Sequence, residues 1–272
     1  MTHSTFCLDA RTVHSHFPGV GRYAANIATA LVACLDADER LVVLRDPRHP
    51  VSWIDTSQSN PRLHTVDVTA SPFSLIQQAV VPRLLRAAHA SLYHSPYYLM
   101  PYWPRVPTVV TLHDLIPLRY PRLFSPPQRL VYQVATRLAV RAAQRIIAVS
   151  VATAHDISQR LRVPAERIVI IPEAADPIFQ PQPAAAITTV CARLNVPRSY
   201  ALYVGSNKPH KNLVRLIEAW ARVRTGDTVL AIAGVWDARF PQAQERAVAL
   251  GVGERVRFLG PVPDADLAAL YS

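Results

Sequence analysis

Lysine is nearly absent from this chain of 272 residues. Only Lys208 and Lys211 among its 29 basic residues are lysines, and both lie within residues 203–213. That stretch holds a glycine turn between an apolar run and a helical pattern. A lysine is a compact, strongly hydrated charge that suits an anionic oxygen such as that of phosphate. We therefore predict an anion site at a helix start, with a merely solvated helix start as the alternative.

Other features that are scarce exclude whole classes of protein. The three cysteines, Cys7, Cys34 and Cys191, are odd in number and far apart, which argues against a disulfide framework and favours a reducing compartment. No apolar run approaches the roughly 18 residues of a membrane-spanning helix. The first residues do not resemble a signal peptide. We expect a cytoplasmic protein. Its basic helix faces would also allow peripheral contact with the inner face of the cell membrane.

Common catalytic and metal-binding motifs are missing as well. There is no CxxC, no GxSxG elbow and no Walker loop. His14 and His16 form a lone pair without spaced carboxylates or thiolates, so we expect no metal site. The net charge of +10 favours anionic partners. Nucleic-acid binding would rest on that charge alone, and we expect none.

The apolar pattern alternates between strand and helix along the whole chain, which predicts an α/β fold with parallel strands. Half of the residues are hydrophobic and 18% are charged, so a packed core is expected. Residues 177–198, rich in proline and alanine, are interpreted as a linker between domains at 1–176 and 199–272. Expected strands lie at 6–8, 41–44, 63–68, 91–94, 108–112, 145–149 and 168–172, and then at 201–204, 228–233 and 255–259.

Three further stretches carry candidate site residues. Gly19 and Gly21 are expected in a loop before the first helix, too far beyond the strand for a dinucleotide fingerprint. A flexible turn with a helix cap is the alternative. His113 follows a buried strand, at the edge where open α/β sheets bind ligands, although a loop carbonyl could instead satisfy it. Glu173 and Asp176, at the end of the first domain, are interpreted as loop-orienting or capping carboxylates.

Taken together, several stretches resemble glycosyltransferase family 4. Its GT-B fold has two Rossmann-like domains that face a cleft. The ordered set of similar stretches runs along nearly the whole chain: GVGRY at 19–23, TLHDLIPLRYP at 111–121, IAVS at 147–150, IPEAAD at 171–176 with Phe179 following, YVG at 203–205 through KNL at 211–213, and VPDADL at 262–267 with LYS at 270–272. The second domain is expected to be incomplete, because only three strands are predicted and the chain stops at Ser272 within an apparent helix.

The resemblance implies retaining transfer of a sugar, with a mannose-like hexose suspected, from a nucleotide diphosphate sugar to a glycan or lipid-linked acceptor. No cofactor or bound metal is implied. The alternative is a non-catalytic remnant that binds sugar or acceptor and has lost its donor domain. The family's Glu-x7-Glu motif would lie beyond Ser272. The chain by itself is therefore expected to be inactive.

The resemblance also assigns roles to individual residues. It implies that His113 contacts the donor sugar and that Lys211 binds the diphosphate, which makes them the catalytic pair. Gly19, Gly21 and Gly205 would lie near the diphosphate, and Arg22 and Tyr23 on the acceptor side. Many family members have an arginine where this chain has Ser206, and the sequence leaves open whether Lys208 replaces that phosphate contact.

Overall fold

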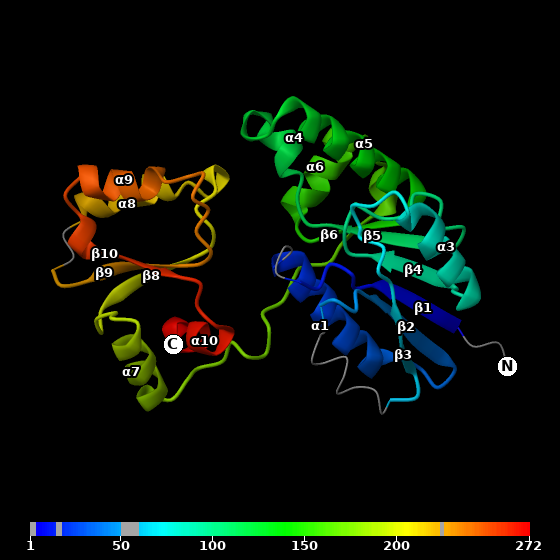
Figure 1. Cartoon of the computed structure of the whole chain (residues 1–272), viewed down its shortest axis with the longest axis horizontal. Coiled ribbons are helices and arrows are strands. Elements are labelled where there is room, and N and C mark those ends of the chain that lie inside the picture. The colour runs from blue at the N-terminus through cyan, green and yellow to red at the C-terminus, as the bar shows by residue number, and fades with distance from the viewer. Residues whose placement is uncertain (1–3, 15–17, 50–59, 224–225) are drawn as a thin grey trace. The chain divides into compact units, whose positions relative to one another are not determined.

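The structure, a computed structural model, describes residues 4–14, 18–49, 60–223 and 226–272. The chain divides into two compact units, Met1–Ala174 and Ala175–Ser272. Each unit is an α/β structure built on its own parallel sheet, as the alternating apolar pattern predicts (Figure 1). In the described residues, no helix combines the length and apolar character needed to cross a bilayer.

The first unit contains a seven-stranded sheet in the order β3-β2-β1-β4-β5-β6-β7, and all six strand pairs are parallel. Its strands are β1 (Ser4–Asp9), β2 (Glu39–Arg45), β3 (Leu63–Asp67), β4 (Leu92–Ser95), β5 (Thr108–Leu112), β6 (Arg145–Ala148) and β7 (Ile168–Ile170). The strand order reverses between β1 and β4. Such a switch point opens a crevice at the carboxyl ends of the strands.

Helices cover both faces of this sheet (Figure 1). They are α1 (Pro18–Cys34), α3 (Gln77–Ala87), α4 (Ile116–Arg119), α5 (Pro126–Ala142) and α6 (Val151–Leu161), with 3-10 turns η1 (Pro121–Leu123) and η2 (Ala165–Arg167). Helix α1 packs Ala28 on one face, together with Leu35 just after the helix. Helices α3, α5 and α6 pack on the other, where Leu85 and Ile157 are fully buried.

Local sequence explains several of these elements. The run 108–112 is apolar or β-branched throughout because β5 is covered on both sides. Ser125 and Gln128 form a capping box at the start of α5, and the Ser150 hydroxyl accepts a hydrogen bond from the Thr153 backbone at the start of α6.

The second unit has a three-stranded parallel sheet in the order β10-β9-β8. Its elements are α7 (Ala184–Arg193), β8 (Tyr200–Val204), η3 (Pro209–Lys211), α8 (Leu213–Arg222), β9 (Val229–Ala233), α9 (Gln242–Ala249), η4 (Gly253–Arg255), β10 (Val256–Gly260) and α10 (Asp264–Tyr271). Helices α8 and α9 pack on one face, around Ile217. Helices α7 and α10 pack on the other, around Val190 and Leu270 (Figure 1).

Two stretches differ from the expected local structure. The segment 177–198, interpreted as a linker, contains helix α7, whose Val190 and Cys191 are buried in the second unit. Gly19 and Gly21 were expected in a loop and instead lie in the first turn of α1. The physical reason is Pro18, because a proline has the backbone φ of a helix and needs no hydrogen-bond partner at the first helical position.

Candidate functional site

The carboxyl edge of the first sheet gathers polar side chains from strands far apart in the sequence. His113 directly follows β5, and Glu173 lies three residues beyond β7. Nδ1 of His113 is 2.8 Å from a carboxylate oxygen of Glu173, and Nε2 is 3.1 Å from the backbone oxygen of Pro96. Both ring nitrogens therefore face acceptors. The ring is held in one orientation, with 19% of the side chain exposed to solvent.

A second chain of hydrogen bonds lies beside His113. The Thr111 hydroxyl is 3.0 Å from the Tyr23 hydroxyl and 2.9 Å from Nε2 of His94. The ring of Tyr23 meets the His113 ring edge to face, with centroids 4.9 Å apart. Three elements, α1, β4 and β5, thus meet at the switch point. Tyr23 is fixed against the same imidazole that Glu173 holds.

Burial shapes the charge states in this group. It lowers the pKa of His94 to about 4, with nearby His113 adding to the effect, so His94 is neutral at physiological pH. Burial also raises the pKa of Tyr23, partly offset by its hydrogen bond to Thr111. His94 and Tyr23 therefore act as neutral hydrogen-bonding partners, and the carboxylate that contacts the His113 ring is that of Glu173.

A buried ion pair supports the loop between β1 and α1. Arg11 is 1% exposed, and its guanidinium contacts both carboxylate oxygens of Asp9 at 2.8 and 2.6 Å. It also donates to Gln77 and to the Ala70 backbone, and the Tyr93 hydroxyl donates to Asp9 at 2.6 Å. Burial alone would raise the pKa of Asp9, but the adjacent guanidinium outweighs it and the pKa is lowered. The carboxylate stays charged and fully partnered.

The two glycines of α1 differ in what surrounds them. A Cβ on Gly21 would lie 2.7 Å from the Thr12 backbone oxygen, whereas one on Gly19 would meet none of the described residues within 4 Å. Gly21 thus lets the helix approach the loop that Asp9 and Arg11 support, and Gly19 leaves open space above the first turn. Arg22, the neighbour of Gly21, is exposed on the helix.

In the second unit, glycines shape the corresponding edge. Gly205, Gly234 and Gly260 stand at the carboxyl ends of the three neighbouring strands, and Gly205 donates to the Ala233 backbone at 2.9 Å. A Cβ on Gly234, whose φ is +140°, would collide with the backbone oxygen of Gly205. A cavity of about 240 Å³ lies here, lined by all three glycines and Asn207. Because glycine has no side chain, the backbone at these three positions can come close to a ligand.

Asn207 holds two loops of this edge together. Its amide nitrogen donates to the backbone oxygens of Asp237 and Phe240 at 2.9 and 2.7 Å, and its amide oxygen accepts from the Asp237 backbone at 2.8 Å. The side chain is only 6% exposed. It therefore fixes the loop after β8 to the loop after β9.

Lys208 directly precedes η3 and Lys211 is its last residue, and both are exposed. Their surroundings differ. Hydrogen bonds from Arg239 chiefly lower the pKa of Asp237 to about 2, and the charge of Lys208 contributes to that shift. Lys208 is thus close enough to Asp237 to influence it, although at longer range than an ion pair. Neither lysine forms an ion pair with a carboxylate of the described residues, so both charges are available to an anionic ligand.

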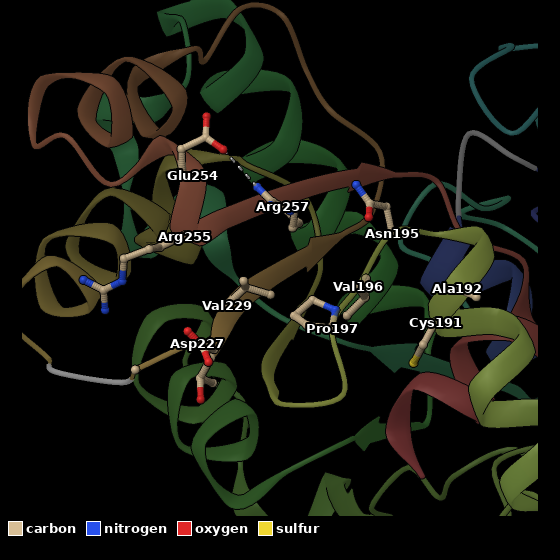
Figure 2. A pocket seen from close by; sticks show the side chains of 12 residues that line it. Cys191, Ala192, Asn195, Val196, Pro197, Asp227, Val229, Glu254, Arg255 and Arg257 are labelled. Atoms are coloured by element: carbon tan, nitrogen blue, oxygen red, sulfur yellow. Dashed lines mark ion pairs between the residues drawn. The ribbon is translucent and has the colours of Figure 1, made fainter.

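Another cavity of the second unit, about 440 Å³, lies apart from these residues. Figure 2 shows it near the start of β9 and β10, lined among others by Asn195, Asp227 and Glu254. Arg257 points toward Glu254 at 4.0 Å. This is the amino end of the sheet, whereas Gly205 and Lys211 follow the carboxyl end of β8. The geometry therefore favours the smaller cavity at the glycine edge as the candidate site.

The structure brings most of the predicted site residues together within each unit. Tyr23 and His113 are in contact, and Gly205, Lys208 and Lys211 share one loop. No group of three or more histidine, cysteine or carboxylate side chains suited to a metal occurs in the described residues. His16 lies outside them, and His14 stacks on His49. His14 thus contacts a histidine that the sequence interpretation did not consider.

Three residues of these edges were not predicted: His94, Thr111 and Asn207. Glu173 was predicted as a loop-orienting or capping carboxylate, but its contact with His113 was not. His94 had a usable signal, because it ends the expected strand at 91–94. Thr111 and Asn207 gave no signal in one sequence, since their importance comes from partners 17 or more residues away.

The comparisons with known proteins agree with this arrangement. Residues 17–178 match the profile of Glycosyltransferase Family 4, and residues 192–272 match that of Glycosyl transferases group 1. O-antigen chain mannosyltransferase B of Escherichia coli is 25% identical over 93% of this chain and 70% of its own. D-inositol 3-phosphate glycosyltransferase of Salinispora tropica is 30% identical, over 68% of this chain and 44% of its own.

Solved structures show the same fold. Sucrose-phosphate synthase of Thermosynechococcus elongatus superposes with a TM-score of 0.70 at 19% identity, over 99% of this chain and 73% of that one. Anabaena HepE in complex with UDP-glucose gives 0.70 at 20% identity, over 98% and 71%. The expected GT-B type of fold is confirmed. With one family profile covering more than half of its length, this chain belongs to glycosyltransferase family 4.

Proposed function

We propose that this chain is part of a retaining glycosyltransferase that moves a mannose-like hexose from a nucleotide diphosphate sugar to a glycan or lipid-linked acceptor. One observation carries the proposal: the two family matches coincide with two sheets whose carboxyl edges each carry a polar site. The names of the relatives, an O-antigen mannosyltransferase and a protein solved with UDP-glucose, support the substrate class.

In the first unit we assign the donor sugar to His113. Glu173 holds Nδ1, so the ring presents Nε2, and a sugar hydroxyl would take the place of the Pro96 carbonyl. Tyr23 packs on the ring and, with Arg22 beside it, would border the acceptor. Gly19, whose Cβ position has no neighbour within 4 Å among the described residues, would leave room for a diphosphate. Gly21 would serve by shaping the loop beneath.

In the second unit we assign the donor diphosphate to the loop of Gly205, Lys208 and Lys211. Breaking the bond from sugar to phosphate places negative charge on the departing diphosphate. Lys211 and the backbone N–H groups near the glycines would stabilise that charge, which is the main electrostatic contribution such a site can make. The proposal includes no metal or cofactor. Because the donor-side sheet has three strands, we propose that the chain by itself binds the donor without transferring the sugar.

Titration of the purified chain with GDP-mannose, UDP-glucose and the corresponding nucleoside diphosphates tests the proposal. We expect saturable binding of at least one nucleotide sugar, weakened by Lys211→Ala. Absence of binding with every donor would count against it. Where acceptors are added, release of nucleoside diphosphate would separate a catalytic chain from a binding-only one. Contact with the inner face of an anionic membrane, in the cytoplasm, belongs to the same proposal.

A further inference from the structure

Helix α5 has apolar side chains on two opposite faces. Its inner face buries Tyr132 and Ala139 in the core of the first unit. On its outer face, Leu130 and Val131 are each 62% exposed and Val134 is 48% exposed. A surface helix normally carries one apolar stripe, toward the core. The outer stripe of α5 is therefore suited to a partner other than water.

The segment just before α5 also exposes apolar side chains. Tyr120 and Leu123, at η1, are 44% and 38% exposed. Hereafter the α4–α5 surface means the exposed residues Tyr120, Leu123, Leu130, Val131 and Val134 with the arginines between and beyond them. Its first helix, α4, begins three residues after His113. The surface is thus close in the chain to the proposed donor-sugar contact.

Charge identifies the partner. The 41 residues between Asp114 and Asp156 contain no carboxylate and six arginines: Arg119, Arg122, Arg129, Arg137, Arg141 and Arg145. Asp156, just beyond this stretch, pairs with Arg119. No carboxylate of the described residues forms an ion pair with Arg122, Arg137 or Arg141. By contrast, residues 36–46 carry Asp36, Asp38, Glu39 and Asp46 in the same unit. The apolar surface therefore lies beside an excess of positive charge.

We infer that the α4–α5 surface docks on an anionic lipid bilayer. Exposed Leu and Val side chains would enter the boundary between headgroups and acyl chains, and the arginines would contact lipid phosphates. An apolar stripe and a polybasic patch on one helix supply the two independent contributions that stable membrane contact requires. This inference rests on the proposed membrane contact and locates it. It would hold the acceptor side of the unit at the surface where a lipid-linked acceptor resides.

Co-sedimentation of the whole chain with vesicles tests the inference. One set is phosphatidylcholine alone, and the other also contains phosphatidylglycerol. We expect binding to the second set that weakens as salt is added. Each arginine near an anionic surface contributes roughly fivefold, so Arg137→Gln with Arg141→Gln should lower partitioning about 25-fold. Leu130→Ser, Val131→Ser and Val134→Ser together should lower it at least tenfold, because the apolar contribution is removed.

Matched controls lie elsewhere on the molecule. Leu75→Ser with Ile76→Ser changes side chains that are 87% and 66% exposed, and Arg215→Gln with Arg222→Gln changes two exposed arginines of α8. Both controls should bind vesicles like the original chain. Equal loss in the controls, unchanged binding of the α5 variants, or no binding to anionic vesicles would overturn the inference. The last result would assign the surface to a protein partner.

Nucleoside diphosphate affinity is measured on the same samples, with circular dichroism as the check on folding. Failure of vesicle binding with nucleotide binding intact overturns only the lipid surface. Vesicle binding without any nucleotide binding contradicts the proposed donor site and leaves the lipid surface standing. The substituted side chains are solvent-exposed, so the fold should be retained in every variant.

Discussion

The carboxyl edges of the two sheets differ in which groups define their shape. In the first unit, side chains fix one another: Glu173 holds His113, Thr111 links Tyr23 to His94, and the Asp9–Arg11 pair lies beneath. In the second unit, backbone defines the shape. Glycines end all three strands, and the lysines above them are exposed.

The difference indicates what each edge can do. A side chain held by two partners can select one orientation of a ligand, which suits recognition of sugar hydroxyls. Bare backbone N–H groups with exposed lysines suit a charged and less directional group such as diphosphate. Asn207 is the exception in the second unit, since it is buried and joins two loops. Substitutions should therefore affect stability mainly in the first unit and ligand affinity mainly in the second.

The largest expected effect is on the buried ion pair. Arg11→Gln leaves the Asp9 carboxylate buried without its counter-charge, which should cost about 3–5 kcal/mol of unfolding free energy. Urea unfolding followed by circular dichroism measures it. Arg239→Gln is the matched control, because Arg239 pairs with Asp237 at the same two-residue spacing but is exposed. The control should unfold at the same urea concentration as the original chain. A small effect of Arg11→Gln would show that the first edge does not depend on its buried network.

Next in size is the effect of Lys211 on the second edge. Lys211→Ala should lower affinity for a nucleoside diphosphate at least tenfold, about 1.4 kcal/mol or more, because the variant loses the positive charge assigned to the diphosphate. Lys208→Ala should have a smaller effect, since Asp237 lies near Lys208. Isothermal titration calorimetry compares the two. If Lys208→Ala weakened binding more, the assignment of the diphosphate contact would be reversed.

The paired glycines of α1 provide a sharper steric comparison. Gly21→Ala should destabilise the first unit by about 1–2 kcal/mol, because the added methyl group meets the Thr12 backbone oxygen. Gly19→Ala has open space and should stabilise the helix by up to about 1 kcal/mol. Thermal unfolding checks both variants. Equal changes in unfolding temperature for Gly19→Ala and Gly21→Ala would contradict the close packing of α1 on the loop. Weaker donor binding by Gly19→Ala would support its proposed place near the diphosphate.

The smallest expected effect concerns pH. The pKa of His94 is about 4 in the folded chain and near 6.5 when unfolded, so between these values the unfolded chain binds more protons. Stability should therefore fall as the pH drops from 6.5 to 5.5, by about 1 kcal/mol. His94→Gln should flatten this dependence, whereas His64→Gln, at an exposed site, should not. If the free energy of unfolding of His94→Gln depended on pH as steeply as that of the original chain, the titrating group would be a residue other than His94.

Much of the fold is predictable from local pattern. The strand at 108–112 and the helix after Ser150 follow from continuous apolar residues and a capping serine. Helix α7 was not predicted, because the prolines at 177, 181 and 183 indicate a linker. The alanines at 184–186 nevertheless favour a helix, and Pro183 is well suited to precede one. Only the packing of Val190 and Cys191 decides between the two.

The candidate site is less predictable than the fold. His113, Tyr23 and the lysine loop stood out because of residue type and position at strand ends. The contact between His113 and Glu173 did not, because Glu173 lies 60 residues away and the contact depends on β5, β6 and β7 being adjacent. Asn207 resembles any loop asparagine until the loop after β9 is placed against it.

The central proposal is that His113 of the first unit contacts a donor sugar and that Lys211 of the second unit binds a diphosphate. The most direct measurement is calorimetric titration of His113→Ala and Lys211→Ala with a nucleotide sugar and with the matching nucleoside diphosphate. We predict that Lys211→Ala weakens both ligands, whereas His113→Ala weakens only the nucleotide sugar. Equal weakening of both ligands by His113→Ala, or no effect of either substitution, would contradict the proposal.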